Sequence, residues 1–438
     1  MRRSMMFISL LTIISAFVLL PRGYCSAQDI SNADIARELS AMKTRLNELE
    51  KEIQKRDERI KELETRAAKT DEELSHTKGH AEGGVPMETK GEGEKGGGVQ
   101  WTDKIKLSGL IEVEGSSEMI KTKDPSQADS EDSRRDDNIT LATVELGAEV
   151  TVNKYVSGTI RLLYEQDETD LTVDEGTITI GGVEETMGFY AVAGRYYPHF
   201  GELNTWFVSD PLTLEVFEIQ ETAAQAGWRN DWFTTGLGVF RGDVLKVGED
   251  ESRIKGFFAD AHFHNPEGTL GGVSIVAGAS YLNNVGETDT LQGPDGLDGK
   301  AVKDRVGGAA GYLTAEYGRF SFGAEYISAF DRFEAGEMNY ALDRDGNAKE
   351  SRPAAWNFEL AFRPIERLQL AGKYEGSKDM FGLYPESQFG LCVSYEIFDS
   401  TVISGEYLHG KYDGNNLNSE GSVSDTRDLF TVQLALIF

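Results

Sequence analysis

The sequence has little positive charge, little cysteine and little proline. Its 438 residues contain 44 Lys and Arg against 74 Asp and Glu, which gives a formal net charge of −30. No run of basic residues is longer than two, so the clustered positive charge that binds phosphate backbones is missing and nucleic acid is excluded as a partner. With 10 Pro beside 48 Gly, the chain is neither collagenous nor a Pro/Gly-rich disordered polymer.

Long apolar runs are missing after the first twenty residues, which excludes a protein that crosses a membrane with helices. The start of the chain reads as an export signal over residues 1–27, with Arg2 and Arg3 before an uncharged run and a small-residue cleavage site at Ala27. A retained anchor and a lipoprotein acylated on Cys25 are the alternatives. Cleavage leaves Cys392 alone, so no internal disulfide is expected.

Residues 28–76 carry a heptad pattern in which apolar residues recur at alternating steps of four and three, as at Leu39, Met42, Leu46, Leu49 and Ile53. This pattern predicts an α-helical coiled coil, because a seam of that width needs a partner helix to cover it. The alternative is an amphipathic helix that packs on its own domain. Residues 77–100 are rich in Gly and Glu and are expected to form a flexible linker.

From residue 101 to 438 the apolar period changes to two, which indicates β-strands. Sixteen such segments are present: 103–115, 138–153, 155–166, 171–181, 188–197, 220–229, 232–241, 254–264, 271–282, 305–317, 319–330, 354–363, 366–377, 386–397, 399–411 and 427–438. Connections after odd-numbered segments are mostly long and polar, as over 116–137, whereas those after even-numbered segments are short, as at Gly318-Arg319. This parity is typical of a transmembrane barrel, whose short turns and long loops lie at opposite rims.

The apolar face of these segments carries aromatic residues, and the opposite face carries charge. Phe358 and Leu360, for example, alternate with Asn357 and Glu359. Apolar side chains outward and polar side chains inward is the arrangement of a barrel in lipid. The predicted fold is therefore an all-β transmembrane barrel of about 16 antiparallel strands, preceded by the coiled coil. A secreted soluble β protein is the alternative.

Charged side chains on the inward face are candidates for lining a pore: Arg161, Arg195, Asp260, His262, His264, Glu359, Arg363 and Lys373. Asp260, His262 and His264 share one strand face and offer metal-ligand atoms, but they lie about 7 Å apart along a strand, which is wide for one ion. No metal site and no cofactor are predicted. The chain has no nucleophile elbow, HExxH motif or phosphate loop, so an enzyme is not expected.

The third long loop holds two distinctive segments, Gly194-Arg195-Tyr196-Tyr197-Pro198-His199-Phe200-Gly201 and Ser209-Asp210-Pro211-Leu212-Thr213-Leu214-Glu215. With the signal, coiled coil and barrel, these resemble the LbtU-type siderophore porin family, whose members pair a Gly-Lys/Arg…Tyr-x-Pro-Phe-Gly segment with a Ser-Asp-Pro-Leu-Thr-Leu-Glu segment. His199 departs from that pattern. The resemblance implies an outer-membrane channel linked to siderophore uptake. Asp210 before Pro211 also has a plain interpretation as a turn.

The residues predict that this loop, over 198–214, folds into the lumen as a constriction, because an external loop has little reason to expose its apolar side chains. The candidate constriction residues are Pro198, Phe200, Trp206, Ser209, Asp210 and Pro211. The acidic stretch 121–137 is expected to be a solvated external loop instead.

We therefore expect an outer-membrane porin for passive diffusion of ferric siderophore or other small polar solutes, with the coiled coil in the periplasm. Its expected partners are the outer-membrane lipid bilayer, the transported solute and further copies of the chain, joined through the coiled coil. The alternative function is a structural anchor whose coiled coil reaches toward the cell wall.

Overall fold

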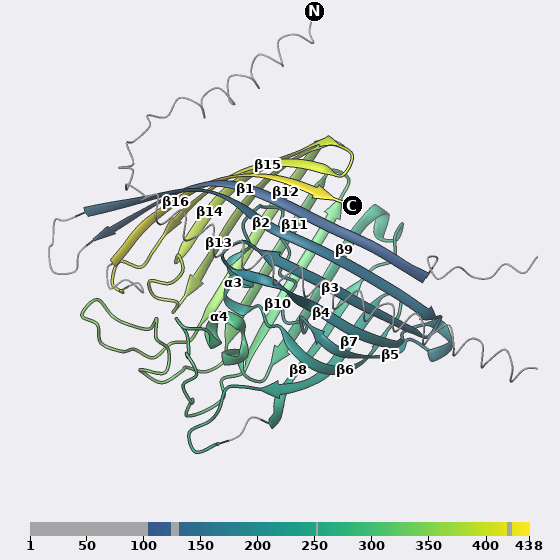
Figure 1. The fold of residues 1–438 in the computed structure, drawn as a ribbon, viewed down its shortest axis with the longest axis horizontal. Coiled ribbons are helices and arrows are strands. Elements are labelled where there is room, and N and C mark those ends of the chain that lie inside the picture. The colour runs from purple at the N-terminus through teal and green to yellow at the C-terminus, as the bar shows by residue number, and fades with distance from the viewer. Residues whose placement is uncertain (1–103, 124–130, 251–252, 418–422) are drawn as a thin grey trace, which may run out of the picture. The chain divides into compact units, whose positions relative to one another are not determined.

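A computed structural model describes residues 104–123, 131–250, 253–417 and 423–438 (Figure 1). Within these residues the chain forms one closed barrel of sixteen antiparallel strands, in which each strand pairs with its sequence neighbours and β1 closes on β16. The predicted signal, coiled coil and linker, residues 1–100, lie outside the described residues.

The elements follow the chain in simple order. The strands are β1 (Ile105–Lys123), β2 (Glu131–Asn153), β3 (Val156–Glu165), β4 (Thr169–Gly181), β5 (Phe189–Tyr196), β6 (Glu221–Arg229), β7 (Phe233–Gly242), β8 (Arg253–His264), β9 (Val273–Leu282), β10 (Gly308–Tyr317), β11 (Phe320–Ala329), β12 (Ala354–Ile365), β13 (Leu368–Lys378), β14 (Ser387–Phe398), β15 (Thr401–Lys411) and β16 (Val423–Ile437). The helical elements are η2 (Glu184–Thr186), α3 (Leu212–Phe217), η3 (Leu270–Gly272), η4 (Val285–Glu287) and α4 (Asp289–Gln292).

The predicted strand ends agree with the structure to within three residues, except in β1, β2 and β16. The prediction of a loop over 116–137 is wrong for 116–123 and 131–137, because β1 and β2 continue through these residues and pair there, for example Ser117 with Asp137. These extensions are mostly polar on both faces, with Met119 and Ile120 as isolated apolar residues, so they lack the apolar alternation by which the other strands were found.

The connections obey the predicted parity. Those after β5, β9 and β11 are long and cover 197–220, 283–307 and 330–353, whereas those after β2 and β10 hold only 154–155 and 318–319. One connection at the long-loop rim, 166–168, is also short. We call the two ends of the barrel the long-loop rim and the short-turn rim.

The outer face of the barrel is apolar. Phe358, Leu360, Phe389 and Leu391 are exposed on β12 and β14, with Leu391 at 65%. Because a closed barrel pairs the backbone groups of every strand, such a surface is compatible with the hydrocarbon core of a bilayer. Among the residues that the structure describes, no helix is long and apolar enough to span a membrane.

The inner face differs from the uniformly polar wall that the alternation predicts. Phe240, Phe258, Leu282 and Ile327 point inward from β7, β8, β9 and β11 and are fully or almost fully buried. They form one hydrophobic core with residues of the long loops. Gly238 on β7 leaves room for this core, since a Cβ there would lie 2.1 Å from the Phe258 ring. Long loops therefore fill one part of the lumen.

Candidate functional site

The connection after β5, residues 197–220, lies inside the barrel; we call it the lumen loop. Its apolar residues Phe200, Val216 and Phe217 are buried in the hydrophobic core. The helix α3 of this loop packs against α4 of the connection after β9 and against β11, β12 and β13. One face of the loop is thus held by apolar packing, and its backbone must find polar partners on the wall.

Those partners are glutamates that point inward from the strands. Glu325 on β11 accepts hydrogen bonds from the backbone amides of Glu202, at 2.6 Å, and Leu203. Glu359 on β12 accepts from the Thr205 hydroxyl at 2.6 Å and from the Trp206 amide at 2.8 Å.

Further along the loop, two more carboxylates continue the row. Glu406 on β15 accepts from the amides of Val208, at 2.8 Å, and Ser209, at 3.1 Å, and from the Ser209 hydroxyl at 2.5 Å. Glu375 on β13 accepts from the Leu212 amide at 2.9 Å. The four glutamates, 325, 359, 375 and 406, thus fasten the loop across the lumen, and we call them the seat glutamates.

Lys373 compensates part of this buried negative charge. Its Nζ lies 3.3 Å from Glu375 Oε1 and 4.0 Å from Glu359 Oε1, and all three side chains are almost wholly buried. The same ammonium stands 4.5 Å from the centre of the Phe207 ring. A buried carboxylate is costly unless it is paired or hydrogen-bonded. All four seat glutamates accept hydrogen bonds from the loop, and Glu359 and Glu375 also pair with Lys373.

Two glycines of the wall make room for the aromatic side chains of the loop. A Cβ on Gly323 would lie 3.3 Å from the Trp206 ring, and one on Gly390 would lie 2.8 Å from the Phe207 ring. The two rings pack against a small cluster of Ala361, Ala371 and Cys392. Packing and hydrogen bonds therefore fix the same stretch of loop.

The other part of the lumen is open and acidic. A cavity of about 740 Å³ lies between the lumen loop and the wall formed by β1, β2, β3 and β14 to β16. Its acidic lining residues are Glu112, Glu114, Glu118, Glu165, Glu168, Asp210 and Glu215, and its lining cation is Arg427. Arg427 is engaged by Glu118, 2.5 Å away, so the lining carries a large excess of carboxylates.

Carboxylates also meet where the lumen loop packs against the connection after β9. Burial, with the charge of Asp289 beside it, raises the pKa of Glu218 to about 8. Burial likewise raises the pKa of Glu215 to about 7 and that of Asp289 to about 6. These groups favour the protonated form over part of the range near neutrality.

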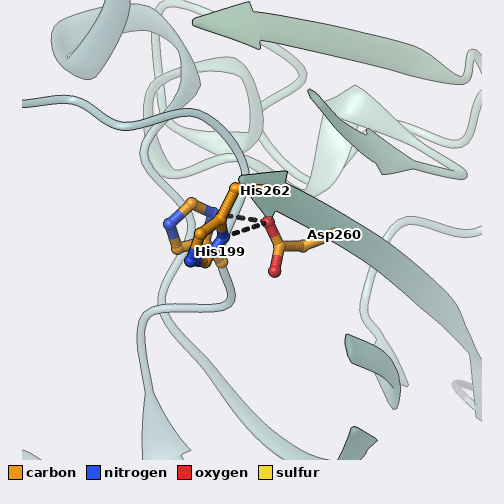
Figure 2. Close-up of side chains that lie close together, drawn as sticks. All are labelled: His199, Asp260 and His262. Carbon is orange, nitrogen blue, oxygen red and sulfur yellow. Dashed lines mark hydrogen bonds and ion pairs between the residues drawn. The ribbon is translucent and has the colours of Figure 1, made fainter. Parts of the chain in front are cut away.

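A separate cluster lies at the start of the lumen loop, where His199 meets strand β8 (Figure 2). His199 Nδ1 is 3.2 Å and His262 Nδ1 is 3.3 Å from the same oxygen, Asp260 Oδ2. The two imidazole rings are stacked with centroids 5.5 Å apart. Asp260 is buried, and the Tyr312 hydroxyl of β10 donates to it at 3.2 Å.

The structure places the other predicted pore residues as follows. Arg161 bridges Glu145 and Glu175 on the neighbouring strands β2 and β4. His264 lies at the short-turn rim against the carbonyl of Asn230, and Arg363 donates to Gln369 near the same rim. Asp260, His262, Glu359 and Lys373 belong to the two clusters described above.

Arg195 departs from the prediction that it faces the lumen. It falls on the exposed face of β5, with Phe189 and Ala193, and donates to Gln220 at the end of the lumen loop. The sequence shows the alternation along β5, but the apolar residues of this strand occur on both faces and left its orientation undecided.

The predicted constriction residues all lie on the lumen loop, but not with the same surroundings. Pro198, Phe200 and Pro211 are buried, Trp206 and Ser209 are held on the seat glutamates, and Asp210 is exposed to the open cavity. Pro211 precedes the first turn of α3. Asp210 and Pro211 thus lead into α3 in extended backbone rather than in a turn, and the acidic side chain of Asp210 is exposed.

Sequence reasoning missed Glu406 and the role of His199. Glu406 alternates with the exposed Tyr407 and Ile403 of β15, so the strand period could have identified it as inward. No pattern in the sequence places His199 beside Asp260, because that contact depends on the path of a loop.

Comparisons with known proteins agree with this barrel. No family model matches the chain. It is similar to a UPF0422 protein of Coxiella burnetii, 23% identical over 304 residues, which cover 66% of this chain and 62% of that protein. A UPF0422 protein of Legionella pneumophila (strain Lens) is 23% identical over 295 residues, 63% of this chain and 54% of that one. The chain thus spans only about half to three fifths of these curated relatives.

Two solved porins share the fold. The structure of Salmonella typhi OmpF in complex with daunomycin superimposes with a TM-score of 0.50 at 12% identity, over 76% of this chain and 97% of that one. An anion-selective porin from Comamonas acidovorans gives a TM-score of 0.50 at 10% identity, over 76% and 99%. The described residues therefore have a porin-like 16-stranded fold.

Proposed function

We propose that the chain forms a passive diffusion channel in the outer membrane and that the lumen loop narrows its pore. The observation that carries this proposal is the seating of residues 202–212 on four inward-facing glutamates of the wall, which leaves an open cavity beside them. A loop that only covered the barrel from outside would have no need of buried acceptors deep on the strands.

The charge of the cavity favours cations among the solutes. Glu112, Glu114 and Glu165 line it together with Asp210, and the lining arginine is paired with Glu118. Rings of carboxylates in a pore attract cations and repel anions. We infer that neutral and cationic polar solutes pass more readily than anionic ones.

A ferric siderophore is the specific solute that the resemblance of the loop motifs supports. We infer that this ferric siderophore has a neutral or positive net charge, because the carboxylates of the cavity would repel an anionic chelate. The long loops lie at the external rim, as in other bacterial outer-membrane barrels. Self-association through residues 28–76 is part of the same proposal, and light scattering with and without those residues tests it: an unchanged assembly size would overturn that part.

Conductance in a planar bilayer tests the channel. We expect stepwise conductance, and a reversal potential in a KCl gradient that shows K⁺ passing in preference to Cl⁻. Replacing Glu112 and Glu114 by Gln should lower this preference several-fold, because both line the cavity. The matched control is Glu185→Gln in the turn between β4 and β5, which pairs with Lys154 and should change nothing.

Two results would contradict the proposal. Selectivity for anions would refute the cation preference, and absence of any conductance from folded protein would favour a structural anchor. Growth on defined ferric chelates of differing charge, with and without the gene, then tests the siderophore assignment by itself.

A further inference from the structure

The cluster of His199, Asp260 and His262 has the donor set of a transition-metal site. Each residue offers one ligand atom, and these atoms all lie within 4.8 Å of one another. Two imidazole nitrogens and a carboxylate oxygen suit Zn²⁺ and similar divalent ions. Figure 2 shows both rings turned toward the Asp260 carboxylate from two separate segments of the chain.

The distances match such an ion. Ligand atoms about 2.0–2.1 Å from a tetrahedral Zn²⁺ are about 3.3 Å from each other. His199 Nδ1 and His262 Nδ1 stand 3.2 and 3.3 Å from Asp260 Oδ2. A short shift of the His199 ring, which is on a loop, brings the two nitrogens to the same separation.

Hydrogen bonding alone accounts poorly for the same contacts. Asp260 Oδ2 has hydrogen bonds with His262 Nδ1 and the Tyr312 hydroxyl, and His199 Nδ1 also lies 3.2 Å from it. His199 Nδ1 is nevertheless buried without a hydrogen bond of acceptable direction. This buried nitrogen therefore has a close carboxylate oxygen but no hydrogen bond, which leaves it open to a metal ion as its partner.

The surroundings are shaped for the cluster. Gly278 on β9 stands beside it, and a Cβ there would lie 2.5 Å from the Tyr312 hydroxyl and 2.6 Å from the His262 Cβ. Tyr312 holds the Asp260 carboxylate in orientation, as outer groups commonly do for metal ligands. Glu202 Oε2 lies 3.8 Å from His199 Nε2, the ring nitrogen that does not face Asp260, and can orient this ring in the same way.

We propose that His199, Asp260 and His262 bind a divalent transition-metal ion, with Zn²⁺ as the type, and that the ion ties the start of the lumen loop to strand β8. His264, the neighbour that the strand pattern suggested as a ligand, is not a member: its Nε2 contacts the carbonyl of Asn230 instead. The site does not depend on which solute the channel carries.

Calorimetric titration of the full chain with ZnCl₂ tests the proposal. The protein is purified in detergent, treated with a chelator and dialysed. His76 and His80, which precede the barrel, are replaced by Gln so that they do not compete. We expect one Zn²⁺ per chain. In His199→Gln and in His262→Gln the binding should be at least roughly tenfold weaker, because removing even a residue that only orients a metal ligand costs about that much affinity.

The chain offers a matched control. His409 Nδ1 lies 2.7 Å from Asp428 Oδ1, so this pair also joins an imidazole to a carboxylate but lacks a second histidine. His409→Gln should leave the Zn²⁺ affinity unchanged. Different migration of unboiled and boiled samples in detergent gels shows that each variant is folded.

Unaltered affinity in both His199→Gln and His262→Gln, or no saturable binding to the parent chain, would overturn the proposal. Zinc-edge X-ray absorption of the parent chain gives a readout without those variants: two imidazole ligands are expected, and one or none would overturn it. Because binding is measured directly, its failure leaves the channel proposal to be judged by conductance alone.

Discussion

The two parts of the lumen are built from opposite chemistry. Along β5 to β12 the inward side chains include Phe240, Phe258 and Leu282, and long loops pack on them. Along β1 the inward side chains include Glu112, Glu114 and Glu118, and they face an open cavity. The inward residues of a barrel strand thus indicate whether protein or water lies against that part of the wall.

Two consecutive residues of strand β8 show this difference between the two faces of the wall. Phe257 is 41% exposed on the outer face, and Phe258 beside it is fully buried on the inner face. A barrel strand that is apolar on both faces has lipid on one side and packed protein on the other. The seat glutamates lie between the two regions and hold the loop that separates them.

The largest expected effect comes from breaking the packed region. Phe217→Ala removes a fully buried ring where the lumen loop meets the other loops, and truncations of this kind cost about 3–5 kcal/mol. We expect the free energy for opening the lumen loop, measured by hydrogen exchange of the α3 amides, to fall by that order. The barrel strands should stay protected, because they have their own backbone pairing.

Val247→Ala is the control for this truncation, since Val247 is 71% exposed in the connection after β7. An exposed substitution of this kind changes stability by less than about 0.5 kcal/mol. If the two substitutions changed the free energy for opening the lumen loop by the same amount, or if neither changed it, the hydrophobic core would not be what holds the lumen loop.

Much of the fold was predictable from the sequence, and the reason is physical. Period-two alternation of Phe358 and Leu360 with Asn357 and Glu359 identified β12 because one face lies against lipid. The same rule failed for residues 116–123 and 131–137, which lie in strands but lack a continuous apolar face, and for Arg195, whose strand has apolar residues on both faces. The contact of His199 with Asp260 depends on the course of a loop, so no periodic pattern in the sequence predicts it.

The next effect concerns the boundary between the two regions. Glu406→Gln keeps the shape of a buried side chain but removes the charge that accepts three hydrogen bonds from Val208 and Ser209. Hydrogen bonds to charged groups contribute about 1.5–3 kcal/mol, so we expect loop opening to become easier by roughly that amount. Single-channel conductance should rise and become noisier as the loop leaves its seat.

Glu396→Gln is the matched control, because this strand glutamate accepts from Ser400 near the short-turn rim rather than from the lumen loop. Its conductance trace should match that of the parent chain. A Glu406→Gln channel with unchanged conductance and unchanged exchange would show that the seat is not what positions the loop.

The smallest effect is a pH dependence at the contact between the lumen loop and the connection after β9. Burial and the nearby carboxylates Asp289, Asp210, Asp174 and Glu215 raise the pKa of Glu218 to about 8. In the opened loop this pKa returns toward its ordinary value near 4.5, so between about pH 4.5 and 8 the closed loop binds more protons than the open one. Raising the pH through this range therefore favours opening. Because Glu218 is only partly buried and water screens it, we expect about 1 kcal/mol in all.

Hydrogen exchange of the α3 amides from pH 5 to pH 8, corrected for the intrinsic rate, measures this dependence. Glu218→Gln should make the profile less steep, since an amide does not titrate, and the remaining slope comes from Glu215 and Asp289. Asp343→Asn should leave it unchanged, because backbone hydrogen bonds with Asn347 lower the pKa of Asp343 to about 2, far below the tested range. Parallel profiles in the parent chain and Glu218→Gln would show that proton binding at this carboxylate does not contribute to loop closure, and any pH dependence would then come from Glu215 and Asp289.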